Sequence, residues 1–122
     1  RRRRFRVVAL LVVALATTAV LVNRPVRDDD LSMGHFNLAN KYVELERWEL
    51  AVTHFERAAK ARPTRISFQN NLALAYERAG RRSDAQATWQ QVHRLGVSQR
   101  RRDYAERAEH HLRELATSDH AR

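Results

Sequence analysis

The 122-residue sequence contains no cysteine, three glycines and two prolines. Without cysteine the chain cannot form a disulfide, a thiolate metal site or a cysteine-linked lipid anchor. Three glycines are too few for a phosphate-binding loop, and the motifs typical of nucleotide-binding proteins, serine hydrolases and zinc proteases are all missing. The six histidines are scattered and show no ligand spacing. We therefore expect no metal, no other cofactor and no catalytic activity.

The chain also lacks acidic residues at its N-terminal end. Seven of the 23 basic residues precede position 28, whereas all 14 acidic residues follow position 27. The net charge of +9 therefore comes mostly from the N-terminal segment, and the remainder of the chain is close to neutral. A near-neutral domain is not typical of a protein whose main role is to bind nucleic acid.

A long apolar run is present once, at residues 7–22, without a charged side chain. As a helix it would extend roughly 24 Å, somewhat less than the ~30 Å of a bilayer core, and Pro25 would end it. The run predicts a retained transmembrane helix. A secretory signal peptide is the alternative, since Ala14, Leu15 and Ala16 form a small-x-small cleavage pattern.

The basic residues beside this run predict its orientation. Positive charge stays on the cytoplasmic side of a membrane, and five arginines precede the run against two that soon follow it. We therefore expect a single-pass protein of the inner (cytoplasmic) membrane with a cytoplasmic N-terminus and the rest of the chain in the periplasm or otherwise outside the cytoplasm. The membrane-flanking residues are Arg1, Arg2, Arg3, Arg4 and Arg6.

The middle of the chain repeats itself every 34 residues, the period of stacked helical hairpins. The first unit has Leu38, Ala39, Tyr42, Ala51 and Phe55, which recur as Leu72, Ala73, Tyr76, Ala85 and Trp89. In these positions the chain resembles the tetratricopeptide repeat (TPR) family. The resemblance covers 68 residues and implies two helix-turn-helix units that bind other proteins rather than catalyse reactions.

Helix signals give approximate boundaries within this region. We expect helices over residues 31–45, 48–61, 65–79, 84–95 and 99–116. Thr64 is a candidate N-cap, Ser83 with Gln86 forms a capping box, and Gly80 and Gly96 are candidate helix ends.

The expected fold class is therefore all-α, with an N-terminal single transmembrane helix, two TPR repeats and a C-terminal capping helix. The expected segments are a basic flank and membrane segment (1–25), a linker (26–31), the repeats (32–65 and 66–99, together 32–99), the capping helix (100–116) and a disordered tail (117–122).

Partner binding is expected in the groove that the first helix of each unit lines in the TPR family. The candidate groove residues are Met33, Phe36, Asn40, Val43, Glu44, Asn70, Asn71, Leu74, Glu77 and Arg78. For the apolar members Met33, Phe36 and Val43, packing against the N-terminal segment is an equally good alternative role.

The sequence thus predicts a non-catalytic, membrane-anchored protein that mediates protein-protein interaction, as an accessory subunit or assembly factor of a bacterial membrane complex. One alternative is a periplasmic scaffold in envelope, pilus or cytochrome biogenesis. Another is binding of nucleic acid or an anionic surface through Arg100, Arg101 and Arg102.

Overall fold

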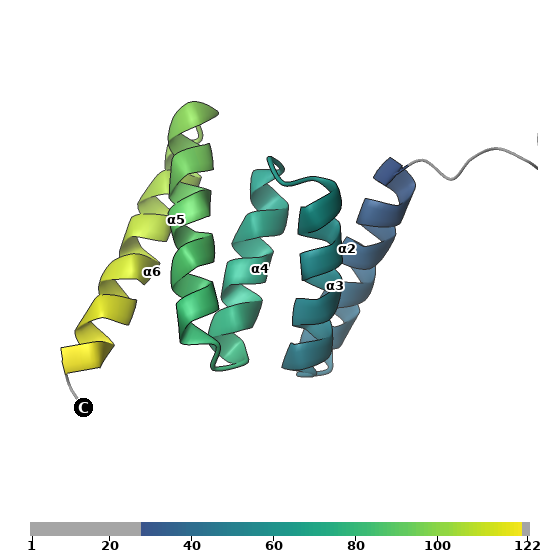
Figure 1. Cartoon of the computed structure of the whole chain (residues 1–122), viewed down its shortest axis with the longest axis horizontal. Coiled ribbons are helices and arrows are strands. Elements are labelled where there is room, and N and C mark those ends of the chain that lie inside the picture. The colour runs from purple at the N-terminus through teal and green to yellow at the C-terminus, as the bar shows by residue number, and fades with distance from the viewer. Residues whose placement is uncertain (1–27, 121–122) are drawn as a thin grey trace, which may run out of the picture.

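The computed structural model describes residues 28–120, and within them the chain forms five α-helices joined by short turns. Their bounds are α2 Asp28–Glu44, α3 Trp48–Ala61, α4 Ile66–Arg78, α5 Arg82–Ser98 and α6 Arg102–His120. Successive helices run in opposite directions, and each packs chiefly against its neighbours in the chain (Figure 1). The fold is all-helical and TPR-like: a row of hairpins that starts at α2 and ends at α6.

The positions that recur every 34 residues form much of the core. Small residues stand where helices approach most closely, and four of them have no exposed surface: Ala39, Ala51, Ala73 and Ala85. Phe55 and Trp89, which are equivalent in the two units, are among the largest of the fully buried side chains. Burying one large apolar side chain contributes about 1.5–3 kcal/mol, so these two residues are major sources of stability.

Equivalent residues of the two units are not always buried to the same extent. Leu72 is buried, whereas Leu38 is 41% exposed. Leu31 and Leu45, seven positions to either side of Leu38, are 52% and 67% exposed. The reason is position in the row: α2 is the first described helix, and among residues 28–120 no helix covers its outer face.

The C-terminal ends of α2 and α4, the first helices of the two hairpins, share one backbone arrangement. The amide of Arg47 donates to the Tyr42 carbonyl at 2.9 Å, and that of Arg81 donates to the Tyr76 carbonyl at 2.9 Å. This six-residue closure requires a left-handed residue, which is Gly80 (φ 73°) in the second hairpin but Glu46 (φ 54°) in the first. The expected role of Gly80 as a helix end is confirmed.

The other expected helix signals were wrong. The residues before α4 and α5 are Arg65 and Arg81, and neither makes a side-chain capping bond. Ser83 lies inside α5, which begins at Arg82. The carbonyl of Thr64 instead accepts a hydrogen bond from the Gln99 side chain at 2.7 Å. The α3–α4 turn is therefore held by the end of α5 rather than by a local cap.

Gly96 does not end a helix either, because α5 continues to Ser98. A Cβ atom built on Gly96 would lie 2.8 Å from the backbone nitrogen of Ala105 in α6. Glycine is needed here for close helix approach, not for a left-handed turn. At the C-terminal end, α6 continues to His120, so residues 117–120, which we expected to be disordered, are helical.

The fold class needs a larger correction. The expected transmembrane helix at residues 7–22 and its flanking arginines lie outside the described residues. None of the helices within residues 28–120 is both long enough and apolar enough to cross a membrane. The fold that the structure supports is all-α with five helices, and the single transmembrane helix that we expected is not among them.

Candidate functional site

A cavity of about 260 Å³ opens between α2 and α4, the first helices of the two hairpins. Helix α3 supplies Trp48 and Phe55 to its wall, and the other lining residues come from α2 and α4. Those residues are Asn40, Val43, Asn71, Leu74, Ala75 and Arg78. We call this cavity the α2–α4 groove.

Five of the ten expected groove residues line the α2–α4 groove: Asn40, Val43, Asn71, Leu74 and Arg78. They occupy one side of α2 and the facing side of α4. The sequence missed Trp48, Phe55 and Ala75. Phe55 had been assigned to repeat packing, and it serves both purposes because its buried ring forms part of the groove wall.

The apolar members nearest the start of α2 pack within the domain. The Phe36 ring stacks on Phe68 with centroids 4.6 Å apart, and it meets Phe55 at 5.6 Å. Met33 is also partly buried against the core. Both residues therefore pack against the core of the domain, and Phe36 joins α2 to α3 and α4. The packing against the N-terminal segment that we left open lies outside the described residues.

The polar members that do not line the groove have partners inside the protein. Glu44 forms an exposed ion pair with Lys41 at 3.0 Å. The Asn70 side chain is buried, and its oxygen accepts a hydrogen bond from Arg107 of α6 at 3.3 Å. Glu77 accepts a hydrogen bond from the indole of Trp89 at 2.5 Å.

Glu77 is in fact the centre of a three-helix contact. Nδ1 of His111 in α6 lies 3.0 Å from the same carboxylate, and the His111 ring stacks on Trp89 with centroids 4.2 Å apart. The side chains of Glu77 and His111 are 24% and 20% exposed. This cluster joins α4, α5 and α6, so Glu77 has a structural role.

The chemistry of the α2–α4 groove is that of a recognition site. Val43, Phe55 and Leu74 supply apolar surface, and the amides of Asn40 and Asn71 can both donate and accept hydrogen bonds. The guanidinium of Arg78 lies 5.7 Å from the centre of the Trp48 ring, which holds one positive charge at the rim. Such a surface can bind an apolar side chain together with the polar backbone beside it.

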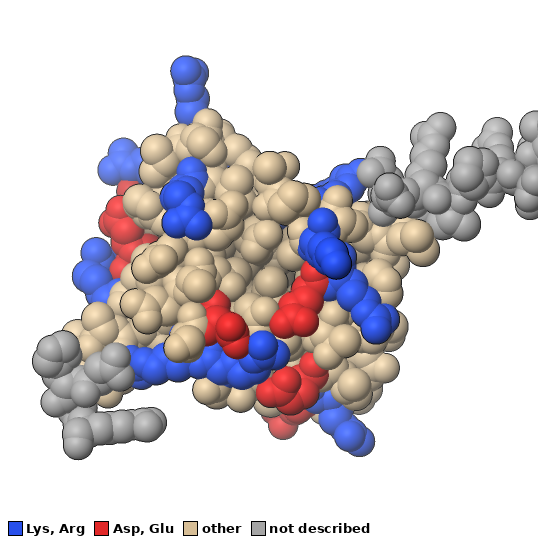
Figure 2. Space-filling model, viewed as in Figure 1, with Lys and Arg blue, Asp and Glu red and all other residues tan. Residues whose placement is uncertain are grey.

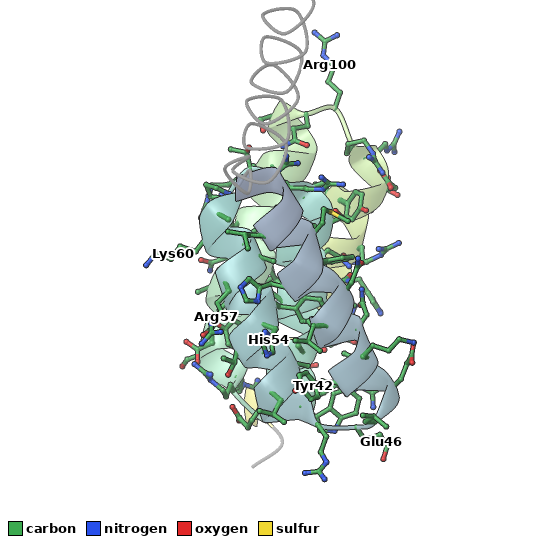
Figure 3. The ribbon with its side chains drawn as sticks, turned by 90° about the vertical axis from the view of Figure 1, so that its right-hand side faces the viewer. Tyr42, Glu46, His54, Arg57, Lys60 and Arg100 are labelled. Atoms are coloured by element: carbon green, nitrogen blue, oxygen red, sulfur yellow. The ribbon has the colours of Figure 1, made fainter. Side chains whose placement is uncertain are left out.

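Basic and acidic side chains are mixed on the face of the molecule that Figure 2 shows. Figure 2 shows basic and acidic side chains side by side around the margin of the face in view, with uncharged residues over its middle. In the expected arginine cluster, Arg101 pairs with Asp103 at 3.0 Å and Arg102 pairs with Glu106 at 2.5 Å. The hydrogen bond from Arg101 also holds the pKa of Asp103 below its ordinary value. Arg100 alone of the three extends from the turn without a carboxylate partner among the described residues (Figure 3).

The described histidines do not come together in a multidentate metal site. Within residues 28–120, no three side chains of histidine, aspartate or glutamate come close enough together to hold a metal ion. Two histidines do meet, however: His35 of α2 and His54 of α3 have their Nδ1 atoms 3.0 Å apart. The sequence did not predict this contact, because the two residues are 19 positions apart on different helices.

Comparison with known families gives one match. A model described as "Bacterial transcriptional activator domain" matches residues 14–101, well over half of the chain. No curated protein matches. The matched domain is a regulatory and binding domain, not a catalytic one, and it is consistent with the helical architecture described above.

This match and the helices together correct the expected localisation. We expected an inner-membrane protein with a periplasmic domain, but no described helix spans a membrane and the matched family is named for transcriptional activation. The expected role as an accessory subunit of a membrane complex, and the alternative of a periplasmic scaffold, are not supported. What remains is a helical regulatory domain that binds protein or nucleic acid.

Proposed function

This chain belongs to the bacterial transcriptional activator domain family, and on that premise we propose that it is a non-catalytic interaction module of a transcription regulator. Its binding surface is the α2–α4 groove, and its ligand is a segment of a partner protein. The observation that carries this proposal is the groove itself, an apolar cavity of about 260 Å³ bordered by two amides and one guanidinium.

The groove has the dimensions and chemistry for a peptide segment. An apolar cavity of about 150 Å³ can hold a benzene-sized group, so this one has room for an aromatic or branched side chain. Asn40 and Asn71 can bond to the partner's backbone, which would fix its direction. Arg78 favours an acidic residue or a carboxylate on the partner.

In-cell photo-crosslinking tests the proposal. A photoreactive amino acid is placed at Leu74, which lines the groove, and separately at Val97, which is 62% exposed at the end of α5. We expect position 74 to crosslink one defined component of the transcription machinery or its regulators, and position 97 not to do so. Leu74→Glu should abolish the regulator's effect on transcription, whereas Val97→Glu should leave it unchanged.

The opposite pattern would overturn the proposal. If position 74 yields no protein crosslink, the groove is not the binding surface. The same conclusion follows if positions 74 and 97 yield the same crosslinks. Thermal unfolding of both glutamate variants provides the control, because a variant that unfolds would lose activity for a trivial reason.

A second candidate is contact with DNA phosphates at the α5–α6 turn. Arg100 holds a left-handed backbone (φ 57°) at the tip of this turn and extends away from the helices (Figure 3). Each phosphate contacted contributes about −0.9 to the slope of log affinity against log salt concentration. Arg100→Gln should reduce that slope by about one if this candidate is correct, and Arg94→Gln should not.

A further inference from the structure

Three rings stack between α2 and α3, on the side of the first hairpin seen in Figure 3. The rings of His35 and His54 have their centroids 5.3 Å apart, and the Tyr42 ring stacks on His54 at 5.4 Å. The two Nδ1 atoms are 3.0 Å apart, within hydrogen-bonding distance. The histidine pair is therefore a direct contact between the two helices.

The hydrogen bond limits how many protons the pair can hold. One Nδ1 must be protonated to donate the hydrogen bond, and the other must be unprotonated to accept it. At least one of the two rings is therefore neutral while the bond exists. A second positive charge would place two imidazolium groups against each other. Burial lowers the pKa of His54, and the neighbouring His35 and the guanidinium of Arg57 lower it further.

A cavity of about 390 Å³ borders His35 on this side of the hairpin. Its lining contains three side chains that are or can become cationic and no carboxylate: Leu31, Ser32, His35, Arg57, Lys60 and Ala61. Arg57 and Lys60 lie one turn apart on α3 and extend to the same side of the molecule in Figure 3. We call this cavity the α2–α3 pocket.

The two α3 cations differ from those basic residues of the protein that pair with a carboxylate. Several basic residues are neutralised by nearby carboxylates, including Lys41, Arg81 and Arg102. Within residues 28–120, Arg57 and Lys60 make no ion pair. Unneutralised cations beside a cavity favour a bound anion, and arginine in particular can bond two oxygens of a phosphate or sulfate at once.

We propose that the α2–α3 pocket binds a phosphate-type dianion through Arg57, Lys60 and His35, and that the His35–His54 pair takes up a proton when the anion binds. The groups facing the pair are Tyr42 from α2 and Arg57 from α3, with Lys60 one turn beyond. A dianion offsets the repulsion that keeps the second proton off the pair. Because linkage is reciprocal, a lower pH must also strengthen anion binding.

Titration calorimetry with sulfate tests the site, because sulfate remains a dianion between pH 8 and pH 6 and so any pH dependence comes from the protein. We expect the dissociation constant to fall about tenfold over this range, a size typical of coupled sites. Sodium chloride at equal ionic strength should not compete. Equal competition by chloride, or a sulfate affinity that does not change with pH, would overturn the proposal.

Variants locate the site. Arg57→Gln should weaken sulfate binding at least fivefold at both pH values, whereas Arg94→Gln, which removes an exposed arginine of α5, should have no effect. His54→Gln should keep the affinity measured at pH 8 and lose most of its pH dependence, with His110→Gln as the matched control. Unchanged binding by Arg57→Gln would show that the anion lies elsewhere.

The same assay distinguishes the sources of the anion. Inorganic phosphate, a phosphoserine peptide and adenosine monophosphate are compared at pH 6, each with the unmodified protein and with Arg57→Gln. Tighter binding of any one of them, lost in Arg57→Gln, supports the pocket and names the class of carrier. Binding of all three that is equal in the two proteins contradicts it. Neither result depends on the α2–α4 groove.

Discussion

At the scale of single residues, two glycines lie inside helices but in opposite surroundings. Gly96 lies where α5 meets α6, and a Cβ atom there would lie 3.0 Å from the Cβ of Ala105 as well as 2.8 Å from its nitrogen. Overpacking against backbone costs about 1–3 kcal/mol, offset in part by the better helix propensity of alanine, about 1 kcal/mol. We expect Gly96→Ala to lower the free energy of unfolding by up to about 2 kcal/mol, measured by urea denaturation.

Gly34 is the matched control because a Cβ atom there meets nothing within 4 Å. It lies in α2, so only the helix-propensity term applies. We expect Gly34→Ala to raise the free energy of unfolding by about 0.5–1 kcal/mol in the same measurement. Two alanine variants that change stability in the same direction would show that the close approach of α5 and α6 is not real.

His54 gives a prediction in pH. Its pKa in the folded protein lies below its ordinary value of 6.5, so the unfolded chain binds more protons. The free energy of unfolding must then decrease as the pH drops below about 6.5 toward the lower pKa of the folded protein. We expect the free energy of unfolding to decrease from pH 7 to pH 5, and His54→Gln to flatten that decrease.

The control for this prediction is His93→Gln, which removes an exposed histidine of α5 paired with Glu109 at 3.1 Å. Asp103 also has a shifted pKa, but its contribution is lost only as the pH falls below about 3.8, outside the window. An equal slope in the wild type and in His54→Gln would contradict the assignment.

At the scale of helices, the Glu77 cluster joins α6 to the two helices before it. Glu77→Ala leaves the buried Trp89 indole without its hydrogen-bond acceptor and removes the partner of His111. A buried polar group left unpaired costs about 1–3 kcal/mol, and we expect a loss of that size in thermal or urea unfolding. Glu109→Ala breaks only exposed ion pairs and should cost less than about 0.5 kcal/mol. A similar small effect in both variants would show that the cluster is not coupled.

The helices were the part of the fold that the sequence predicted best. The expected helix over residues 48–61 matches α3, because the 34-residue period fixes its place in the first unit. Gly80 was predictable since only glycine adopts its backbone easily. The predictions for Ser83 and Gly96 were wrong because each residue type has two common roles. A serine can cap a helix or lie inside it, and a glycine can end a helix or allow a second helix to pack closely.

The candidate site was predictable only in part. Asn40, Val43 and Leu74 were predicted because the first helix of each unit lines the groove in the TPR family. All three line the α2–α4 groove in the structure. Asn70 and Glu77 were assigned to the same groove, but α6 covers that side of α4 and engages both. The contact of His35 with His54 depends on how two helices rotate against each other, which spacing along one chain does not specify.

At the scale of the whole molecule, the helices form a row in which contacts are mainly between neighbours. Stability in such an array is approximately the sum of local terms and neighbour contacts. Helices α3, α4 and α5 have packing partners on both sides, whereas α2 and α6 have one principal neighbour each within residues 28–120. We therefore expect α2 and α6 to unfold locally while α3, α4 and α5 remain folded.

Native-state hydrogen exchange tests this expectation directly. Backbone amides of α2 and α6 should exchange through openings of lower free energy than those of α3, α4 and α5. Leu112→Ala removes a partly buried side chain of α6, so it should accelerate exchange in α6 several-fold and leave α3 unchanged. Val97→Ala, at an exposed position, is the control. If Leu112→Ala instead accelerates exchange equally in all five helices, the row unfolds as one cooperative unit, and a ligand bound at the first hairpin would stabilise α6 as strongly as it stabilises α2.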